Sequence, residues 1–208
     1  MKKRKRRKNK TQLSSTDYLQ PEQIRFIEEF LLKWDAGGGY RAAVNLFLFQ
    51  FLLMTGLRRC EAAGIEMRDL PMRHGKDIID VRWQVAKNGR ARGIVLDDTM
   101  VEIIRDFAER FRKGAPPHSP LLINEYGRRM TAESIYSRIK TIGRRTGLEW
   151  LHPHALRHTY GSLCGDKFFL KAQLGHVSLD TTEIYAHIAN IEIKNKVSAI
   201  SRQITIRK

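Results

Sequence analysis

Cysteine is scarce in this 208-residue chain, and no apolar run is long enough to cross a membrane. Cys60 and Cys164 are the two cysteines. They are too few for a disulfide framework, and they form no Cys-x-x-Cys pair that would indicate a zinc site. The longest apolar stretch, Ala42–Met54, has 13 residues and contains Asn45 and Gln50. A bilayer span needs about 18 or more apolar residues, so this stretch predicts a buried core helix.

Acidic residues are also in short supply. The chain has 22 Asp and Glu against 38 Lys and Arg, which gives a formal net charge of +16 and a pI near 10.2. Such a surplus favours a polyanionic partner, either nucleic acid or an anionic membrane surface. The basic start leads into polar residues and not into an apolar region, so no signal peptide is predicted. Because 42% of the residues are hydrophobic, a wholly disordered chain is excluded. The composition indicates one soluble, basic domain for a reducing compartment.

Basic residues are concentrated at the N-terminus, where eight of the first ten residues are Lys or Arg. Such a run repels itself and is expected to be disordered alone. It has two interpretations: a tail for solubility or localisation, or an arm that orders on DNA by contacting phosphates. We divide the chain into this tail, 1–16, and a domain, 17–208. The predicted phosphate contacts of the tail are Lys2, Lys3, Arg4, Lys5, Arg6, Arg7 and Lys8.

Apolar residues recur at helical spacing along most of the chain. They predict helices over 17–34, over 42–54 with an end at Thr55–Gly56, from near Arg58, over 98–113 and from Thr131. Shorter helices are predicted over 154–162, 168–174, 179–186 and 190–204. The exposed side of the helix from Thr131 is expected to carry four basic residues: Arg138, Lys140, Arg144 and Arg145. We assign its three arginines to DNA binding.

One short hairpin interrupts the helices. Ile78–Ala86 is rich in Ile, Val and Trp, Asn88–Gly89 is a strong two-residue turn signal, and Arg90–Leu96 is the predicted return strand. So short a hairpin predicts a small sheet on a helical body.

The last predicted helix carries one apolar stripe: Ile193, Val197, Ile200 and Ile204. The stripe has two interpretations, packing on its own domain or docking on a neighbouring protomer.

Arg58, Glu61 and Lys87 are candidate site residues on local grounds. A guanidinium at the start of a helix, as expected for Arg58, makes a good anion clamp. Glu61 would orient Arg58 or act as a first-turn acid, and Arg59 is expected to be a surface residue. Lys87, at the hairpin tip, is either a solvated turn residue or a cation that reaches a phosphodiester.

The run His152–His158 places several titratable groups together. Pro153 starts a helix there, so His154 and Arg157 share a face and combine a proton-transfer group with a bidentate phosphate ligand. A metal site at His152 and His158 lacks convincing further ligands, and His158 is expected to be structural.

Tyr185 is the candidate nucleophile. Taken alone it is a packing residue, but a phenol that attacks a phosphodiester needs positive groups around the phosphate. Several cations in this sequence would supply them without a metal: Arg58, Lys87, His154, Arg157 and His176.

The sequence resembles the tyrosine recombinases, the phage-integrase family. The matching motifs are TGLRRCE at Thr55–Glu61, KNGRARGIVL at Lys87–Leu96, HPHALRHTYGS at His152–Ser162 and LGHVSLDTTEIYAHI at Leu174–Ile188. They occur in family order and with the family's spacing from LGH to Tyr. The resemblance covers about Tyr18 to Ile188.

The resemblance implies a fold and a chemistry. The fold is α+β, a mainly helical catalytic domain with a small antiparallel sheet. Most members of the family carry a separate core-binding domain before it; this sequence departs from that pattern, and we expect a single-domain member or a fragment. The reaction is DNA strand exchange through a covalent 3′-phosphotyrosyl intermediate, with no metal, nucleotide or other cofactor. The implied roles are nucleophile for Tyr185, general acid for Lys87, phosphate ligands for Arg58, Arg157 and His176, assistance to proton transfer for His154, and support of Arg58 for Glu61.

Three functions follow from these expectations. The first is a site-specific DNA recombinase, an integrase or invertase, that assembles as a homo-oligomer on paired sites in double-stranded DNA. The second is a catalytically inactive DNA-binding accessory protein of the same fold. The third is a type IB topoisomerase-like relaxing enzyme. The expected location is the nucleoid in the cytoplasm, although KKRKRRK in the tail also matches a nuclear-import pattern.

Overall fold

Helices dominate the part of the chain that the structure, a computed structural model, describes: residues 18–36, 39–71, 77–86, 89–164, 195, 197–199 and 201–202. In chain order the elements are α1 (Pro21–Ala36), α2 (Tyr40–Thr55), α3 (Arg59–Gly64), the 3-10 turn η1 (Met67–Asp69), β1 (Ile78–Val81), β2 (Arg92–Val95), α4 (Asp98–Phe111), α5 (Ala132–Arg145) and α6 (Pro153–Cys164). The prediction of a mainly helical domain with a small antiparallel sheet is confirmed.

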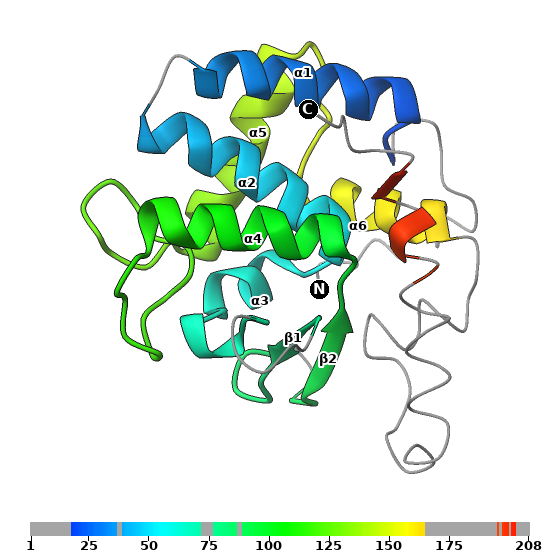
Figure 1. Ribbon diagram of the computed structural model, residues 1–208. Helices are drawn as coiled ribbons and strands as arrows, with labels where there is room; N and C mark the ends of the chain where they lie inside the picture. Colours follow the sequence, from blue (N-terminus) through cyan, green and yellow to red (C-terminus); the bar gives the residue numbers. More distant parts are fainter. Residues whose placement is uncertain are drawn as a thin grey trace, which may run out of the picture.

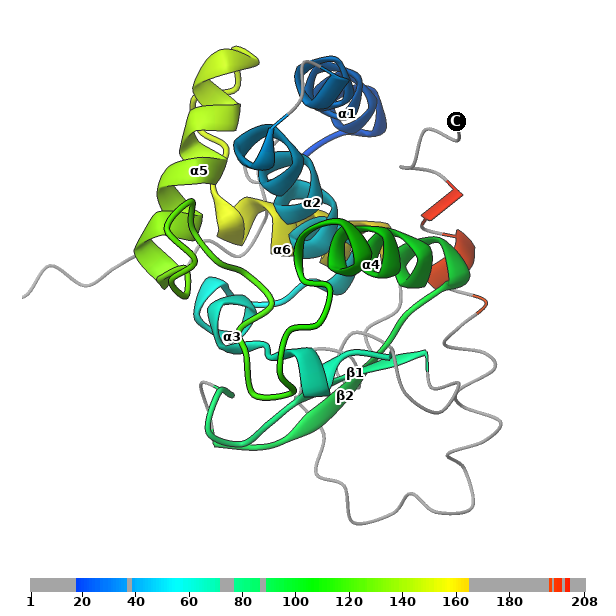
Figure 2. The ribbon, with the colours of Figure 1, turned by 60° about the vertical axis from the view of Figure 1, so that its left-hand side comes forward.

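Helix α2 is the centre of the fold. It packs against α1, α4, α5 and α6, and the two-stranded sheet lies at the opposite end of the molecule from α1 (Figures 1 and 2). All its residues from Phe47 to Thr55 are buried, as expected for a helix that is hydrophobic on all sides. Its three buried polar side chains have partners: Asn45 accepts from Arg138, Gln50 donates to Glu28, and Thr55 donates to the carbonyl of Phe51. The predicted core helix over 42–54 is therefore confirmed.

A glycine ends α2 and sets the entry into α3. Gly56 has a φ of 62°, and its N–H donates to the carbonyl of Leu52. This left-handed position suits glycine, which has no Cβ to clash. Arg58 follows in extended conformation as the N-cap of α3. The expected boundary at Thr55–Gly56 is confirmed.

The hairpin differs from its prediction. β1 and β2 pair antiparallel with Val81 opposite Arg92, so residues 82–91 connect the strands. The prediction of a two-residue turn at Asn88–Gly89 is therefore wrong. The predicted first strand continued to Ala86, whereas the N–H groups of Val85 and Ala86 both donate to the carbonyl of Arg82 at 3.0 Å. These local bonds form a turn in place of further ladder bonds.

Side-chain caps define the starts of α4 and α5. Asp97 accepts from the N–H of Met100 at 3.0 Å, and Thr131 accepts from the N–H of Ser134 at 3.1 Å. Each cap satisfies a backbone donor that the helix itself leaves unpaired. Both predicted starts are confirmed.

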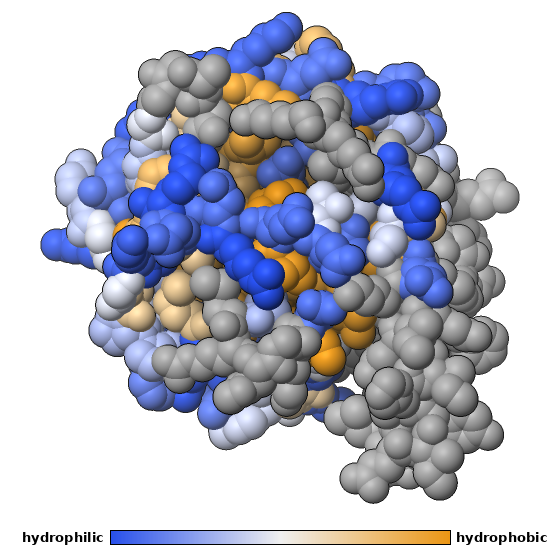
Figure 3. Space-filling view, viewed as in Figure 1, coloured by the Kyte–Doolittle hydropathy of each residue, from blue (hydrophilic) through white to orange (hydrophobic). Residues whose placement is uncertain are grey.

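Arg138 on α5 is not on the exposed side as predicted. Its side chain is 16% exposed, and its guanidinium donates to Asn45 and to Glu125. Arg144 and Arg145 are exposed, and the Arg145 guanidinium lies over the Trp34 ring, 4.2 Å from its centroid. In the coloured part of the face in Figure 3, hydrophilic residues surround a central strip of apolar residues.

The C-terminal part shows how one residue of the apolar stripe, Val197, packs. Val197 is helical, 1% exposed and part of the hydrophobic core of its own chain. For this residue of the apolar stripe, packing on its own domain is the observed arrangement. The helices predicted over 168–174 and 179–186 lie outside the described residues. Within the described part of the chain, no helix has the length and apolar character that a membrane span requires.

Candidate active site

The α2–α3 junction brings two of the candidate arginines to one place. Arg157 on α6 is buried, and its Nη1 donates to the carbonyl of Gly56 at 2.6 Å. Gly56 lies two residues before Arg58, which begins α3. The fold therefore joins residues about a hundred positions apart in the chain.

Glu61 organises the start of α3. Its Oε2 accepts from the backbone N–H of Arg58 at 2.9 Å, and its Oε1 accepts from Nη1 of Arg58 at 3.2 Å. The carboxylate is fully buried, whereas the Arg58 side chain is 25% exposed. Glu61 thus holds both the backbone and the side chain of Arg58, which agrees with the support that the resemblance implies.

Arg92 is a third arginine of the site, and the sequence analysis missed it. Its Nη1 and Nη2 donate to Oε1 and Oε2 of Glu61 at 3.1 and 2.9 Å. This bidentate pair is almost completely buried. The alternation of the predicted strand could have indicated its role. Residues two apart on a strand share a face, so Arg92 lies on the same face as the buried Ile94. A charged residue on a buried face needs a partner of opposite charge.

Burial and charge shift the pKa values in this group. Burial by itself would raise the pKa of Glu61, but the hydrogen bonds from Arg92 and Arg58 and their charges outweigh it and hold that pKa below its usual value. Burial, together with the charges of Arg58 and Arg92, lowers the pKa of Arg157 to about 10. Arg157 is still protonated at neutral pH. Glu61 thus pairs with Arg58 and Arg92, and Arg157 lies close enough for the charges of all three to affect its pKa. Such a concentration of positive charge favours an anion.

The start of α6 presents His154. His152 caps this helix, because its Nδ1 accepts from the N–H of Ala155 at 2.9 Å; this accounts for His152 without a metal. His154 is exposed, and its ring meets the His158 ring edge-on with 4.4 Å between centroids. Partial burial, and then the charges of His158, Arg157, His152 and Arg58, lower the pKa of His154 below 6.5. A neutral imidazole at pH 7 can accept a proton.

Arg58, His154 and Arg157 line one pocket of about 580 Å³. Besides Arg58, His154 and Arg157, its lining includes Arg59 and Tyr136. Arg59 is a surface residue, as expected, with a side chain 42% exposed. Its guanidinium lies 5.2 Å from the centroid of the Tyr136 ring and 3.2 Å from Glu133. The pocket therefore has cations on its α3 and α6 walls and an aromatic side chain on its α5 wall.

The structure thus brings together Arg58, Glu61, His154 and Arg157. Lys87, His176 and Tyr185 lie outside the described residues, as do the tail residues from Lys2 to Lys8. Their placement stays a prediction.

Residues 17–192 match the sequence model of the phage integrase family. The chain belongs to the phage integrase family. That match covers most of the chain and includes every motif on which the resemblance rested.

Among curated members of the family, tyrosine recombinase XerC of Pseudomonas entomophila is 28% identical over 145 residues. The aligned part is 68% of this chain and 47% of XerC. The chain spans about half the length of the curated relatives it matches.

Solved structures of family members share the fold. XerH site-specific recombinase bound to difH substrate is 24% identical with a TM-score of 0.63, over 85% of this chain and 51% of that one. The Tn1549 transposon integrase in complex with transposon right end DNA is 17% identical with a TM-score of 0.60, over 96% and 64% of the two chains. At these identities the likeness shows the fold alone.

Proposed function

We propose that this chain is the catalytic domain of a site-specific DNA recombinase, which cleaves and rejoins double-stranded DNA through a covalent phosphotyrosyl intermediate. One observation carries the proposal: Arg58 and Arg157 line one pocket with His154, and the two guanidiniums are close enough for the charge of Arg58 to help lower the pKa of Arg157. A phosphodiester is an anion whose attack by a nucleophile adds further negative charge, and preorganised cations stabilise that charge.

In the proposed reaction, the phenol oxygen of Tyr185 attacks the scissile phosphorus. The bond from phosphorus to the 5′-oxygen breaks, and a 3′-phosphotyrosyl bond forms. His154 takes the phenol proton, while Lys87 gives a proton to the leaving 5′-oxygen. Attack by the 5′-hydroxyl of another strand reverses these steps and restores the phenol. The phosphotyrosyl bond keeps the energy of the phosphodiester, so no nucleotide is consumed.

Arg58 and Arg157 would bind the non-bridging oxygens of the phosphate. Arg157 supports this role because burial among other cations disfavours its charged form, so an incoming anion would offset that cost. The Gly56 carbonyl and Glu61 fix the two guanidiniums before substrate arrives, and such preorganisation is a large part of catalysis by charge. His176 would add a hydrogen bond to the phosphate.

A covalent trap tests the proposal. The purified chain is mixed with sheared genomic DNA of its source, denatured with SDS, and the protein-linked DNA is recovered and sequenced. We expect an adduct at a defined sequence that disappears in Tyr185→Phe. DNA binding without any adduct would favour the inactive accessory protein, and relaxation of an arbitrary supercoiled plasmid would favour the topoisomerase-like enzyme.

DNA contacts are proposed for the tail, 1–16, and for exposed residues of α5, Arg144 and Arg145. If the tail is a phosphate-binding arm, its deletion should flatten the salt dependence of DNA affinity, because each phosphate contact releases condensed counterions. An unchanged slope after deletion would favour a tail for solubility or localisation. The proposed location is the nucleoid.

Assembly as a homo-oligomer on paired sites is proposed as well, since strand exchange between two duplexes needs four cleavages. Sedimentation of the chain with one-site and two-site duplexes tests this. Deleting the residues after Ile188 should weaken assembly more than folding if the C-terminal stripe links protomers. Equal loss of both would fit packing within one chain, which Val197 shows.

A further inference from the structure

We propose that Arg82 is a positioning residue for the general acid: it pins the start of the β1–β2 connection, which carries Lys87, onto the end of helix α3. The inference rests on the proposed function, because Lys87 has this role only in that reaction. Arg82 itself is not one of the residues that line the pocket.

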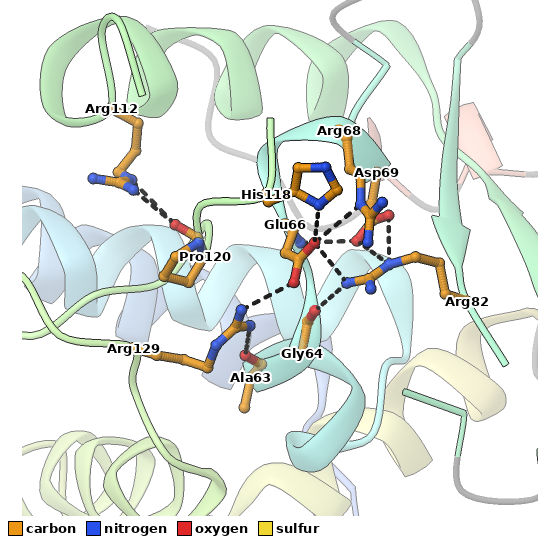
Figure 4. Close-up of polar contacts among 10 residues, drawn as sticks. All are labelled: Ala63, Gly64, Glu66, Arg68, Asp69, Arg82, Arg112, His118, Pro120 and Arg129. Atoms are coloured by element: carbon orange, nitrogen blue, oxygen red, sulfur yellow. Dashed lines mark hydrogen bonds and ion pairs between the residues drawn. The ribbon is translucent and has the colours of Figure 1, made fainter. Parts of the chain in front are cut away.

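The Arg82 side chain is held from several directions (Figure 4). Its Nε donates to Oδ1 and Oδ2 of Asp69 at 2.8 and 3.0 Å, and its Nη2 donates to the carbonyl of Gly64 at 2.8 Å. Nη2 also lies 3.3 Å from Oε2 of Glu66. Asp69 is 3% exposed and the Arg82 side chain 20% exposed, so these bonds are little screened by water.

The backbone of Arg82 fixes the residues that lead to Lys87. Its carbonyl accepts from the N–H groups of Val85 and Ala86, both at 3.0 Å. The Val85 side chain lies directly on Gly64, where an added Cβ would collide with Cγ1 of Val85. Ala86, which immediately precedes Lys87, is buried. One arginine thus joins the end of α3 to the last described residue before the proposed general acid.

The other end of the connection is fixed to the same helix. Arg92, directly after residues 82–91, grips Glu61 with both terminal nitrogens. Glu61 in turn holds Arg58 at the start of α3. Helix α3 therefore serves as a common reference for the phosphate ligand Arg58 and for both ends of the segment that carries Lys87. Since misplacing a catalytic group by about 1 Å can slow a reaction by about 100-fold, we expect Arg82 to affect proton transfer specifically.

The same cluster provides a matched control. Arg129 also donates to Glu66, at 3.1 Å, and to a carbonyl of α3, that of Ala63, at 3.0 Å (Figure 4). It reaches the cluster from the segment before α5. Among the described residues it meets Arg82 only indirectly, through the carboxylate of Glu66, and it does not bond to the backbone that leads to Lys87. Arg129→Gln therefore removes an arginine–Glu66 contact and a carbonyl hydrogen bond without releasing the connection.

The test compares two leaving groups. The probe is a duplex with the cleavage sequence found by the covalent trap, made with either the ordinary 5′-oxygen or a bridging 5′-sulfur at the scissile position. A thiol is far more acidic than an alcohol, so sulfur leaves as thiolate and needs no proton from the protein. Single-turnover cleavage is measured for the full chain and its variants.

We expect Arg82→Gln to cleave ordinary DNA about 100-fold more slowly than wild type and to recover most of its rate on the sulfur substrate, as Lys87→Ala should. Arg58→Ala should be slow on both substrates, because it acts on the non-bridging oxygens. Arg129→Gln should stay close to wild type on both. Arg82→Lys, which keeps the charge but not the fork, serves if Arg82→Gln does not fold, and should show the same recovery.

Three results would overturn the inference. Arg82→Gln as fast as Arg129→Gln on ordinary DNA would show that the anchor does not matter. An Arg82→Gln rate equally low on oxygen and sulfur substrates would show a role outside proton transfer. Failure of wild type to form an adduct on any DNA would refute the proposed function itself, and with it this role for Arg82.

Discussion

The buried pair of Arg92 and Glu61 gives the sharpest prediction on stability. In Arg92→Met the aliphatic stem stays, but the Glu61 carboxylate, fully buried, loses the two hydrogen bonds of the guanidinium fork. Removing one partner of a buried ion pair costs about 3–5 kcal/mol, because the other charge stays buried without compensation. Arg58 still contacts Glu61, so we expect the lower half of that range.

The assay is thermal unfolding followed by circular dichroism. For a chain of this size 1 kcal/mol corresponds to about 2–4 °C in Tm, so Arg92→Met should lower Tm by about 6–16 °C. A matched control is Arg41→Met. Arg41 also forms a two-pronged pair, with Glu125 at 3.0 and 2.8 Å, but its side chain is 68% exposed. Water screens exposed pairs, so they contribute little to stability, and this variant should lower Tm much less than Arg92→Met does.

A double-mutant cycle isolates the pair. Glu61→Gln combined with Arg92→Met leaves no buried unpaired carboxylate. The double variant should therefore lose less free energy of unfolding than the two single variants together, by about 0.5–3 kcal/mol. The pH dependence of stability provides a second check on the role of Glu61. The pKa of Glu61 is lowered in the folded state, so its stabilisation is complete above its ordinary pKa of 4.5 and is lost as the pH falls through the lower, folded value. Equal Tm losses for Arg92→Met and Arg41→Met, or strictly additive singles, would refute this account.

Further predictions concern catalysis, the contact of Leu19 with α6, and the packing of the β1–β2 connection on α3. Since burial and neighbouring cations lower the pKa of His154 from its ordinary value of 6.5, the acid limb of the rate of adduct formation should be centred below pH 6.5; a limb centred above 6.5 would contradict this assignment. Thr159→Val should lower the free energy of unfolding by about 1–3 kcal/mol, because it leaves the buried N–H of Leu19, now bonded to Oγ1 at 2.9 Å, without its acceptor. Gly64→Ala should cost about 1–3 kcal/mol by overpacking, and adding Val85→Ala should restore most of it; denaturant unfolding of the single and double variants measures both.

Local patterns in the sequence determined the helices and the candidate residues. A continuous apolar run predicts the central helix α2, and Gly56 predicts its end, because both depend on near neighbours in the chain. The spacing of His154 and Arg157 likewise places them on one face of α6 before any tertiary contact is known. The family motifs then join these residues to Lys87, His176 and Tyr185, which no local rule connects.

Only the tertiary structure decided which charges meet. The two-residue turn predicted at Asn88–Gly89 rests on local sequence alone. It does not form because the strands pair with Val81 opposite Arg92, and strand register depends on which faces are buried. The role of Arg138 changed because Glu125 and Asn45 come close to it only in the folded chain. Arg82 has no distinguishing pattern in the sequence, and the position of Arg92 on an apolar strand face indicates a buried partner without saying which one. They become structural because the fold brings buried carboxylates from the α3–η1 segment within hydrogen-bond reach, and a buried charge must find a partner.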